Sequence, residues 1–129
     1  MIVLDTETTG LSLQDNKLIE ISAARMHGRE VVERFDTFVH PGCPIPAEIT
    51  RLTSITDADV ATAPSAEEAV AALEKFVGGC PVIAHNATFD RSFIESVKGG
   101  VRVSDIWIDS LALSRIALPR LASHKLSFM

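Results

Sequence analysis

Two carboxylates stand close together near the start of the chain, where a short apolar run ends. Residues 2–4 read IVL, and Asp5 and Glu7 follow in the segment 5–10, which reads DTETTG. Because side chains two residues apart in a strand point to the same face, the two carboxylates are expected to project together. Such a pair repels unless a cation lies between them, and a hard divalent ion prefers oxygen ligands. The alternative is a polar turn in which Asp5 caps backbone N–H groups and Glu7 is solvated.

A third carboxylate, Asp90, follows a second apolar run, in the segment 81–90, which reads PVIAHNATFD. The pattern predicts a helix after this run, and on it Asp90 shares one face with apolar residues. These residues are Phe93, Ile94 and Val97. A charge on an apolar face requires a partner, and no Lys or Arg lies on that face. A metal ion shared with Asp5 and Glu7 is the economical explanation.

The elements that must position these residues can be read from the spacing of apolar residues and turn signals. Strands are expected at 1–6, 17–26 and 31–39, joined by short turns into an antiparallel meander. After Pro41, Pro44 and Pro46, a short helix is expected over 47–52. The second half then alternates, with a helix between Ser65 and Gly78, a strand at 81–84, a helix at 88–97, a strand at 103–108 and a helix from Asp109 or Ser110 to before Pro119. The sequence therefore predicts a mixed sheet with flanking helices, an α/β architecture.

Composition restricts the class of protein. The 129 residues and 47% hydrophobic content fit one domain, residues 1–129, with its own core. The net charge of −5 argues against nucleic-acid binding through a broad basic patch. It is nevertheless compatible with binding of a strand end by a carboxylate site that holds cations. We find neither a leader nor an apolar run of about 18 residues, so we expect a cytoplasmic protein without membrane contact. Cys43 and Cys80 lack metal-site spacing and are expected to be reduced.

The two motifs, in this order, resemble the first two motifs of the DEDDh 3′–5′ exonucleases, the family that includes the proofreading subunits and domains of bacterial DNA polymerase III. Segments 45–56 and 108–126 also fit that family, so the similarity spans nearly the whole chain. The resemblance implies a ribonuclease H-like fold with the first strand central. It also implies hydrolysis of phosphodiester bonds at a single-stranded or frayed DNA 3′ end, with two divalent cations, Mg²⁺ or Mn²⁺. A DNA polymerase or a helicase is the partner that it suggests.

Roles for individual residues follow from the resemblance. Asp5 is expected to bridge the two ions, Glu7 to bind one ion and the terminal 3′-hydroxyl, and Asp90 to act partly through water. The expected substrate contacts are Thr6, Thr8, Leu11, His85 and Phe89. For the threonines a turn-forming role is an equal alternative, and for Phe89 packing in the core is slightly favoured. Trp107 is expected in the core.

The family has a third motif on a C-terminal helix, with a histidine and, five residues later, a carboxylate. No such pair follows in this sequence, so we expect a C-terminally incomplete domain from a longer parent protein. His124 matches the segment ahead of that helix, and we assign it a packing or capping role. Asp105 and Asp109 remain as candidates for a fourth metal ligand, although Asp109 fits a helix cap better.

Two other functions stay open at this point. One is a truncated, nuclease-inactive domain that binds DNA ends or a polymerase partner. The other is an exonuclease directed at RNA, because residues that would read the 2′-hydroxyl cannot be identified from the sequence.

Overall fold

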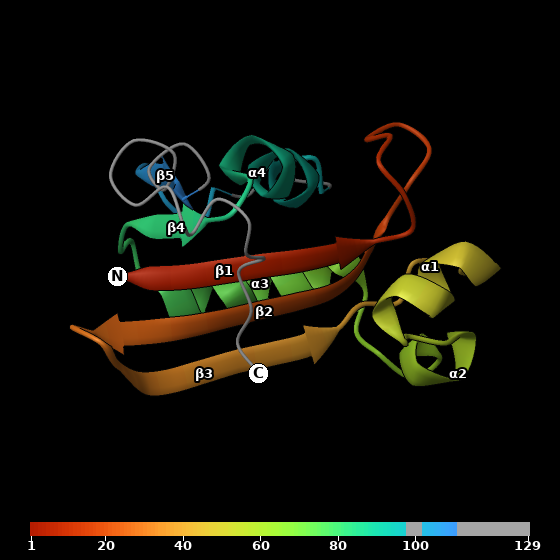
Figure 1. The fold of residues 1–129 in the computed structure, drawn as a ribbon, viewed down its shortest axis with the longest axis horizontal. Coiled ribbons are helices and arrows are strands. Elements are labelled where there is room, and N and C mark those ends of the chain that lie inside the picture. Colours follow the sequence, from red (N-terminus) through yellow and green to blue (C-terminus); the bar gives the residue numbers. More distant parts are fainter. Residues whose placement is uncertain (98–101, 111–129) are drawn as a thin grey trace.

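Five strands form one mixed sheet in the order β3-β2-β1-β4-β5 (Figure 1). The computed structural model describes residues 1–97 and 102–110. The strands are β1 (Ile2–Thr8), β2 (Leu18–His27), β3 (Glu30–Phe38), β4 (Val82–Ala84) and β5 (Trp107–Asp109). β1 pairs antiparallel with β2, which pairs antiparallel with β3, whereas β4 is parallel to both β1 and β5. The predicted meander, the α/β class and the central position of the first strand are therefore confirmed.

Four helices accompany the sheet within the described residues: α1 (Ala47–Thr53), α2 (Asp57–Val60), α3 (Ala66–Val77) and α4 (Ala87–Glu95). Figure 1 shows α3 running across one face of the sheet, α4 following β4, and α1 and α2 together beyond the end of β3. No helix in the described part of the chain is long and apolar enough to cross a membrane.

The longest helix, α3, has the signals that the sequence predicts for it. The Ser65 hydroxyl accepts a hydrogen bond from the Glu68 N–H, and the Glu68 carboxylate accepts one from the Ser65 N–H, which forms a capping box. At the other end Gly78 adopts a left-handed conformation with φ of 58° and ends the helix. Its buried face consists of Ala69, Val70, Leu73 and Val77.

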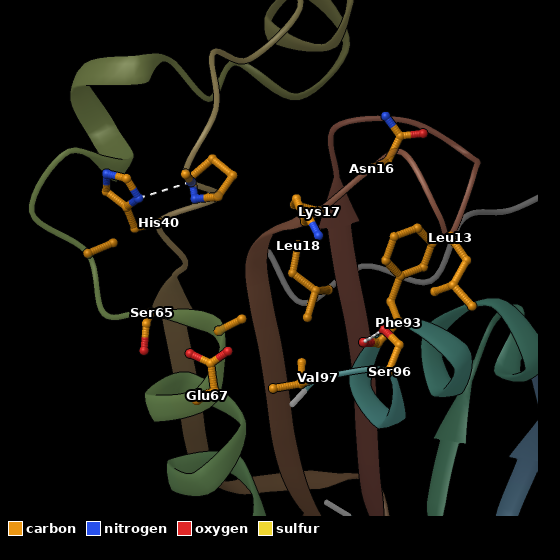
Figure 2. Close-up of a pocket in the computed structure, with 14 residues that line it drawn as sticks. Leu13, Asn16, Lys17, Leu18, His40, Ser65, Glu67, Phe93, Ser96 and Val97 are labelled. Atoms are coloured by element: carbon orange, nitrogen blue, oxygen red, sulfur yellow. Dashed lines mark hydrogen bonds between the residues drawn. The ribbon is translucent and has the colours of Figure 1, made fainter. Parts of the chain in front are cut away.

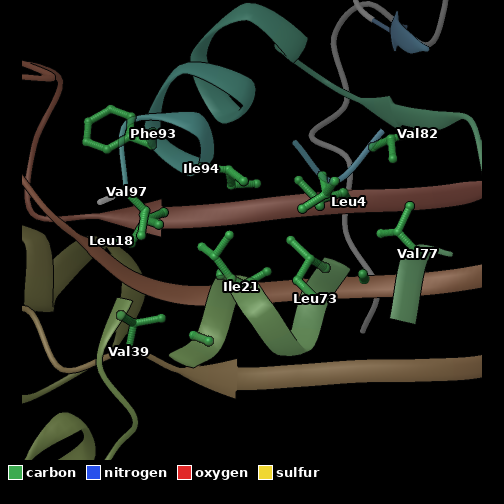
Figure 3. Close-up of a cluster of buried hydrophobic side chains, with 14 of the residues drawn as sticks. Leu4, Leu18, Ile21, Val39, Leu73, Val77, Val82, Phe93, Ile94 and Val97 are labelled. Atoms are coloured by element: carbon green, nitrogen blue, oxygen red, sulfur yellow. The ribbon is translucent and has the colours of Figure 1, made fainter. Parts of the chain in front are cut away.

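The main core lies between the sheet and the helices α3 and α4 (Figure 3). On β1, buried and half-buried residues alternate, with Ile2 and Leu4 in the core. Thr6 and Thr8 are also buried, whereas Asp5 and Glu7 are half-buried and point to the opposite face of the sheet. Thus one strand supplies core residues from one face and the two carboxylates of the first motif from the other.

A smaller apolar cluster packs α1 and α2 against the start of β2. It contains Ile19, Ile45, Ile55 and Val60. The four-residue α2 was not predicted, because it is too short to show apolar periodicity. Its Thr56–Asp59 capping box is nevertheless visible in the sequence, and the structure forms it.

The last strand differs from its predicted position. A strand was expected at 103–108, but β5 covers only Trp107–Asp109. The Ser104 hydroxyl accepts a hydrogen bond from the Ile106 N–H at 3.1 Å and donates to the Cys80 carbonyl at 2.8 Å. These side-chain contacts hold the chain in a turn and delay the strand. The helix expected after Asp109 lies almost wholly in residues 111–129, outside the described residues.

Candidate active site

The site begins where β4 ends and β1 continues. The pairing of β1 with β4 stops at Leu4 and Ala84. Beyond that point Thr6 lies on an edge of β1 that β4 does not cover. The chain instead turns into α4, whose N-terminal cap is Asn86, with its side-chain oxygen 3.4 Å from the Phe89 nitrogen. The first turns of α4 are therefore brought against this edge.

Asp90 lies at the junction of α4 and β1 and is only 4% exposed. Its carboxylate accepts a hydrogen bond from the Thr6 hydroxyl and a second from the Thr6 backbone N–H. The prediction that Asp90 sits on the apolar face of its helix is thus confirmed by its burial. Its hydrogen-bond partner is the residue between the two acidic residues of the first motif.

The electrostatic environment of Asp90 disfavours its charged form. Burial raises the pKa of Asp90 to about 7, with further contributions from the charges of Asp5 and Glu7, although the hydrogen bonds from Thr6 act in the opposite direction. Three carboxyl groups therefore influence one another at this end of β1. A cation bound among them offsets the free-energy cost of ionising Asp90, because it favours the charged form of each carboxylate.

The geometry is not that of a closed metal site. In the described residues, no three His, Cys, Asp or Glu side chains converge closely enough to hold an ion. Asp90 reaches β1 at the strand edge through Thr6, whereas Asp5 and Glu7 project from the other face of the strand. The donor set is chemically suitable, because carboxylate oxygens are the ligands that Mg²⁺ and Mn²⁺ prefer.

Further carboxylates share the sheet face of Asp5 and Glu7. Glu20 is directly opposite Glu7 in the β1–β2 ladder. Burial raises the pKa of Glu20, and the charges of Glu7 and Asp36 raise it further. This face of the sheet is therefore strongly acidic around the first motif, which the analysis of single motifs did not detect.

The loop after β1 is fixed by its own side chains. The Thr8 hydroxyl donates to the Gly10 carbonyl at 2.5 Å, and the Thr9 hydroxyl oxygen accepts from the Lys17 N–H at 3.0 Å. A Cβ atom at Gly10 would lie 2.6 Å from the Asn16 side-chain oxygen, so a larger residue there would have to displace the Asn16 side chain. The loop carries Leu11 with 86% of its surface exposed.

The structure separates the residues that were predicted to contact substrate. The Thr8 hydroxyl donates to Gly10 within the turn, which agrees with the turn-forming alternative, whereas the Thr6 hydroxyl donates to Asp90. Phe89 is partly buried and packs against Phe93 with ring centroids 4.9 Å apart. His85 is half-buried between β4 and α4. Of the five residues, Leu11 is the most available to a ligand.

The candidates for a fourth metal ligand are in different environments. Asp105 is exposed and forms an ion pair with Arg102 at 3.5 Å. Asp109 is the last residue of β5 and pairs with Ala84, so it lies at the same edge of the sheet as the end of β4. His124 lies outside the described residues. Trp107, which was predicted in the core, is partly buried against it and donates from its indole N–H to the Ser104 carbonyl.

A pocket of about 680 Å³ lies beside the site but contains none of the three carboxylates (Figure 2). Figure 2 shows His40 and Glu67 on one side of it, and Phe93 and Ser96 of the α4 region on the other. Phe93 is about one turn after Asp90 on α4, so the same helix carries Asp90 and part of the pocket wall.

Comparison with known proteins agrees with this arrangement. The exonuclease family model RNase_T matches residues 2–129. A PolC-type DNA polymerase III of Caldanaerobacter subterraneus is 42% identical over 97% of this chain, and one of Bacillus cereus is 37% identical over 99%. The chain spans only 9% of the length of each of these two relatives.

Solved structures show the same fold. Exonuclease X in complex with 5′ overhanging duplex DNA has a TM-score of 0.71 and 28% identity, covering 92% of this chain and 64% of that chain. Exonuclease I without ligand has a TM-score of 0.74 at 15% identity, covering 99% of this chain and 32% of that chain, which shows the fold alone. On the match of the family model over almost the whole chain, this protein belongs to the RNase_T family of exonucleases.

Proposed function

We propose that this exonuclease removes nucleotides from the 3′ ends of DNA, with Asp5, Glu7 and Asp90 as the carboxylates that bind its metal ions. The observation that carries the proposal is the burial of Asp90 against Thr6. In the sequence, Thr6 lies between the two acidic residues of the first motif. The contact of Asp90 with Thr6 brings together two motifs that are far apart in the sequence, in the order in which they occur in DEDDh exonucleases.

Two divalent cations, Mg²⁺ or Mn²⁺, fit this set of oxygen ligands. When bound, such ions stabilise the attacking and leaving oxygens of a phosphodiester during in-line hydrolysis. In this proposal Asp5 would hold both ions, and Glu7 would hold one ion and contact the terminal 3′-hydroxyl. Asp90 contributes oxygen atoms from the edge of β1.

The acidic side chains must rearrange for this to occur, because in the described residues they do not converge on one point. Asp90 is held by two hydrogen bonds from Thr6, whereas Asp5 and Glu7 are half-buried on the other face of β1. We therefore expect Asp5 and Glu7 to turn towards Asp90 when ions bind. Their mutual repulsion and the raised pKa of Asp90 are then relieved by the positive charge.

Leu11 is the substrate contact that the geometry supports best. An exposed leucine on a loop fixed by hydrogen bonds can press against the terminal base without unfolding of the core. We retain His85 and Phe89 as secondary contacts, because both lie at the start of α4 near Asp90.

A single-stranded or frayed 3′ end is the substrate that we propose. Exonuclease X has been solved with duplex DNA that carries a 5′ overhang, and the two relatives given above are PolC-type DNA polymerases III. We accordingly propose that the protein functions in proofreading in the cytoplasm, with a polymerase of that type as its partner.

The test is degradation of a 5′-labelled single-stranded oligonucleotide with Mg²⁺ or Mn²⁺. We expect a ladder of shortened products that disappears with a chelator and in the Asp5→Asn variant, with RNA of the same sequence as a competing substrate. A ladder that persists in Asp5→Asn disproves the assignment of Asp5. Binding of DNA ends without a ladder favours a nuclease-inactive domain, and preferred cleavage of RNA favours the RNA-directed alternative.

A further inference from the structure

Strand β4 ends before β1 does, so the edge of β1 that faces β4 is unpaired with a strand from Thr6 onward. Ile2 donates its backbone N–H to the Pro81 carbonyl at 2.9 Å, which shows that even-numbered residues of β1 face β4. The paired register ends at Leu4 and Ala84, so the next N–H on this edge belongs to Thr6. The acceptor that it meets is not a strand carbonyl but the Asp90 carboxylate.

Thr6 presents two donors to that one carboxylate. Its hydroxyl and its N–H both bond to Asp90, and Thr6 itself is only 7% exposed. Hydrogen bonds to a charged acceptor are stronger than those between neutral groups, and burial excludes water that would compete for the same oxygen atoms. The carboxylate is therefore restricted in rotation and tied to the strand that carries Asp5 and Glu7.

We propose that Thr6 is a positioning residue, which fixes the Asp90 carboxylate at the edge of β1 so that it can bind a divalent cation together with Asp5 and Glu7. This inference rests on the proposed function and replaces the substrate contact that the sequence suggested for the Thr6 side chain. A group that orients a metal ligand through a hydrogen bond typically changes metal affinity 10- to 100-fold when it is removed.

The structure offers a matched control for the loss of a threonine hydroxyl. Thr6 pairs with Ile21 in the β1–β2 ladder, and Ile21 pairs with Thr37 in the β2–β3 ladder. Among the residues that the structure describes, the Thr37 hydroxyl donates only to the Phe38 carbonyl, at 2.8 Å. Thr37→Val therefore makes the same chemical change in the same sheet, two strands away from Asp90.

The experiment is titration of the metal-free purified protein with Mn²⁺ alone by calorimetry at pH 8. We expect Thr6→Val to bind Mn²⁺ at least tenfold more weakly, and Thr6→Ser and Thr37→Val to bind within about twofold of the unchanged protein. Circular dichroism establishes folding, and Thr6→Ala repeats the test if the valine variant does not fold. Equal or tighter Mn²⁺ binding by a folded variant without the hydroxyl overturns the inference.

Asp90→Asn separates this inference from the proposed function. If Asp90→Asn loses Mn²⁺ binding while Thr6→Val keeps it, Asp90 is a ligand but Thr6 does not position it. If Asp90→Asn binds Mn²⁺ as tightly as the unchanged protein, the proposed metal site itself is wrong.

Discussion

The hydroxyl of Thr6 donates a hydrogen bond to the carboxylate of Asp90, a residue 84 positions further along the chain. This contact joins the end of the central strand to the first turns of α4 and places Asp90 in the electrostatic field of Asp5 and Glu7. The first prediction follows from the raised pKa of Asp90, which is caused mainly by burial and further by the charges of Asp5 and Glu7.

The stability of the metal-free protein is predicted to fall as the pH rises from about 4 to about 7. The pKa of Asp90 is raised from 3.8 to about 7, so in this range the folded state binds more protons than the unfolded state. The loss is on the order of a few kcal/mol, since one pKa unit corresponds to about 1.4 kcal/mol. Chemical denaturation at several pH values measures it.

Asp90→Asn is the matched variant for that measurement, because the amide cannot ionise. The difference in unfolding free energy between this variant and the unchanged protein should grow in favour of the variant between pH 4 and pH 7. A constant difference across this range shows that Asp90 does not carry the titration. Above pH 7, added Mn²⁺ should stabilise the unchanged protein more than Asp90→Asn, because the ion favours the charged carboxylate.

Leu11→Ala is predicted to impair substrate binding without affecting the fold. The side chain is 86% exposed, so its removal should change the unfolding free energy by less than about 0.5 kcal/mol. We expect the Michaelis constant for a single-stranded oligonucleotide to rise several-fold. Val32→Ala, at a residue 51% exposed on the edge strand β3, serves as the control and should leave that constant unchanged. If the two variants behave alike, the role of Leu11 is refuted.

Leu73→Ala should be strongly destabilising, whereas Leu52→Ala should not. Leu73 is fully buried in the core beneath the sheet, and Leu52 on α1 is 73% exposed. Truncation of a buried leucine costs about 2–5 kcal/mol, compared with less than about 0.5 kcal/mol at an exposed site. Denaturant titration of both variants checks the difference, and similar midpoints would contradict the packing of α3 against the sheet.

Ser65→Ala is predicted to cost about 1 kcal/mol of stability, because it removes an acceptor for the first N–H groups of α3. Glu68→Gln should cost less, since glutamine can also complete a capping box. Thermal unfolding of the two variants compares them. A larger loss for Glu68→Gln contradicts the assigned capping geometry.

The parts of the fold that depend on local signals were predicted well. The capping box at Ser65, the apolar spacing along α3 and the alternation along β1 are properties of short segments, and the structure has each of them. β5 was placed too early because the hydrogen bonds of Ser104 reach to Cys80, 24 residues away in the sequence. α2 was missed because four residues contain little periodicity.

The site was predicted in its residues but not in its geometry. Spacing alone indicates that Asp5 and Glu7 share a face and that Asp90 lies on an apolar face of a helix. It cannot indicate that β4 stops at Ala84 and leaves the Thr6 N–H for Asp90, since this depends on the register of two distant strands. Thr6 was consequently interpreted either as a substrate contact or as a turn-forming residue, and its bond to Asp90 was missed.

The central claim is that Asp5, Glu7 and Asp90 hold the same metal ions. A crystal structure of the protein soaked with Mn²⁺, with anomalous scattering to locate the ions, tests it most directly. The account predicts anomalous peaks within about 2.0–2.3 Å of carboxylate oxygens from all three residues, a distance typical of such ions. Ions bound elsewhere, or bound to Asp5 and Glu7 without a contact to Asp90, would contradict the account.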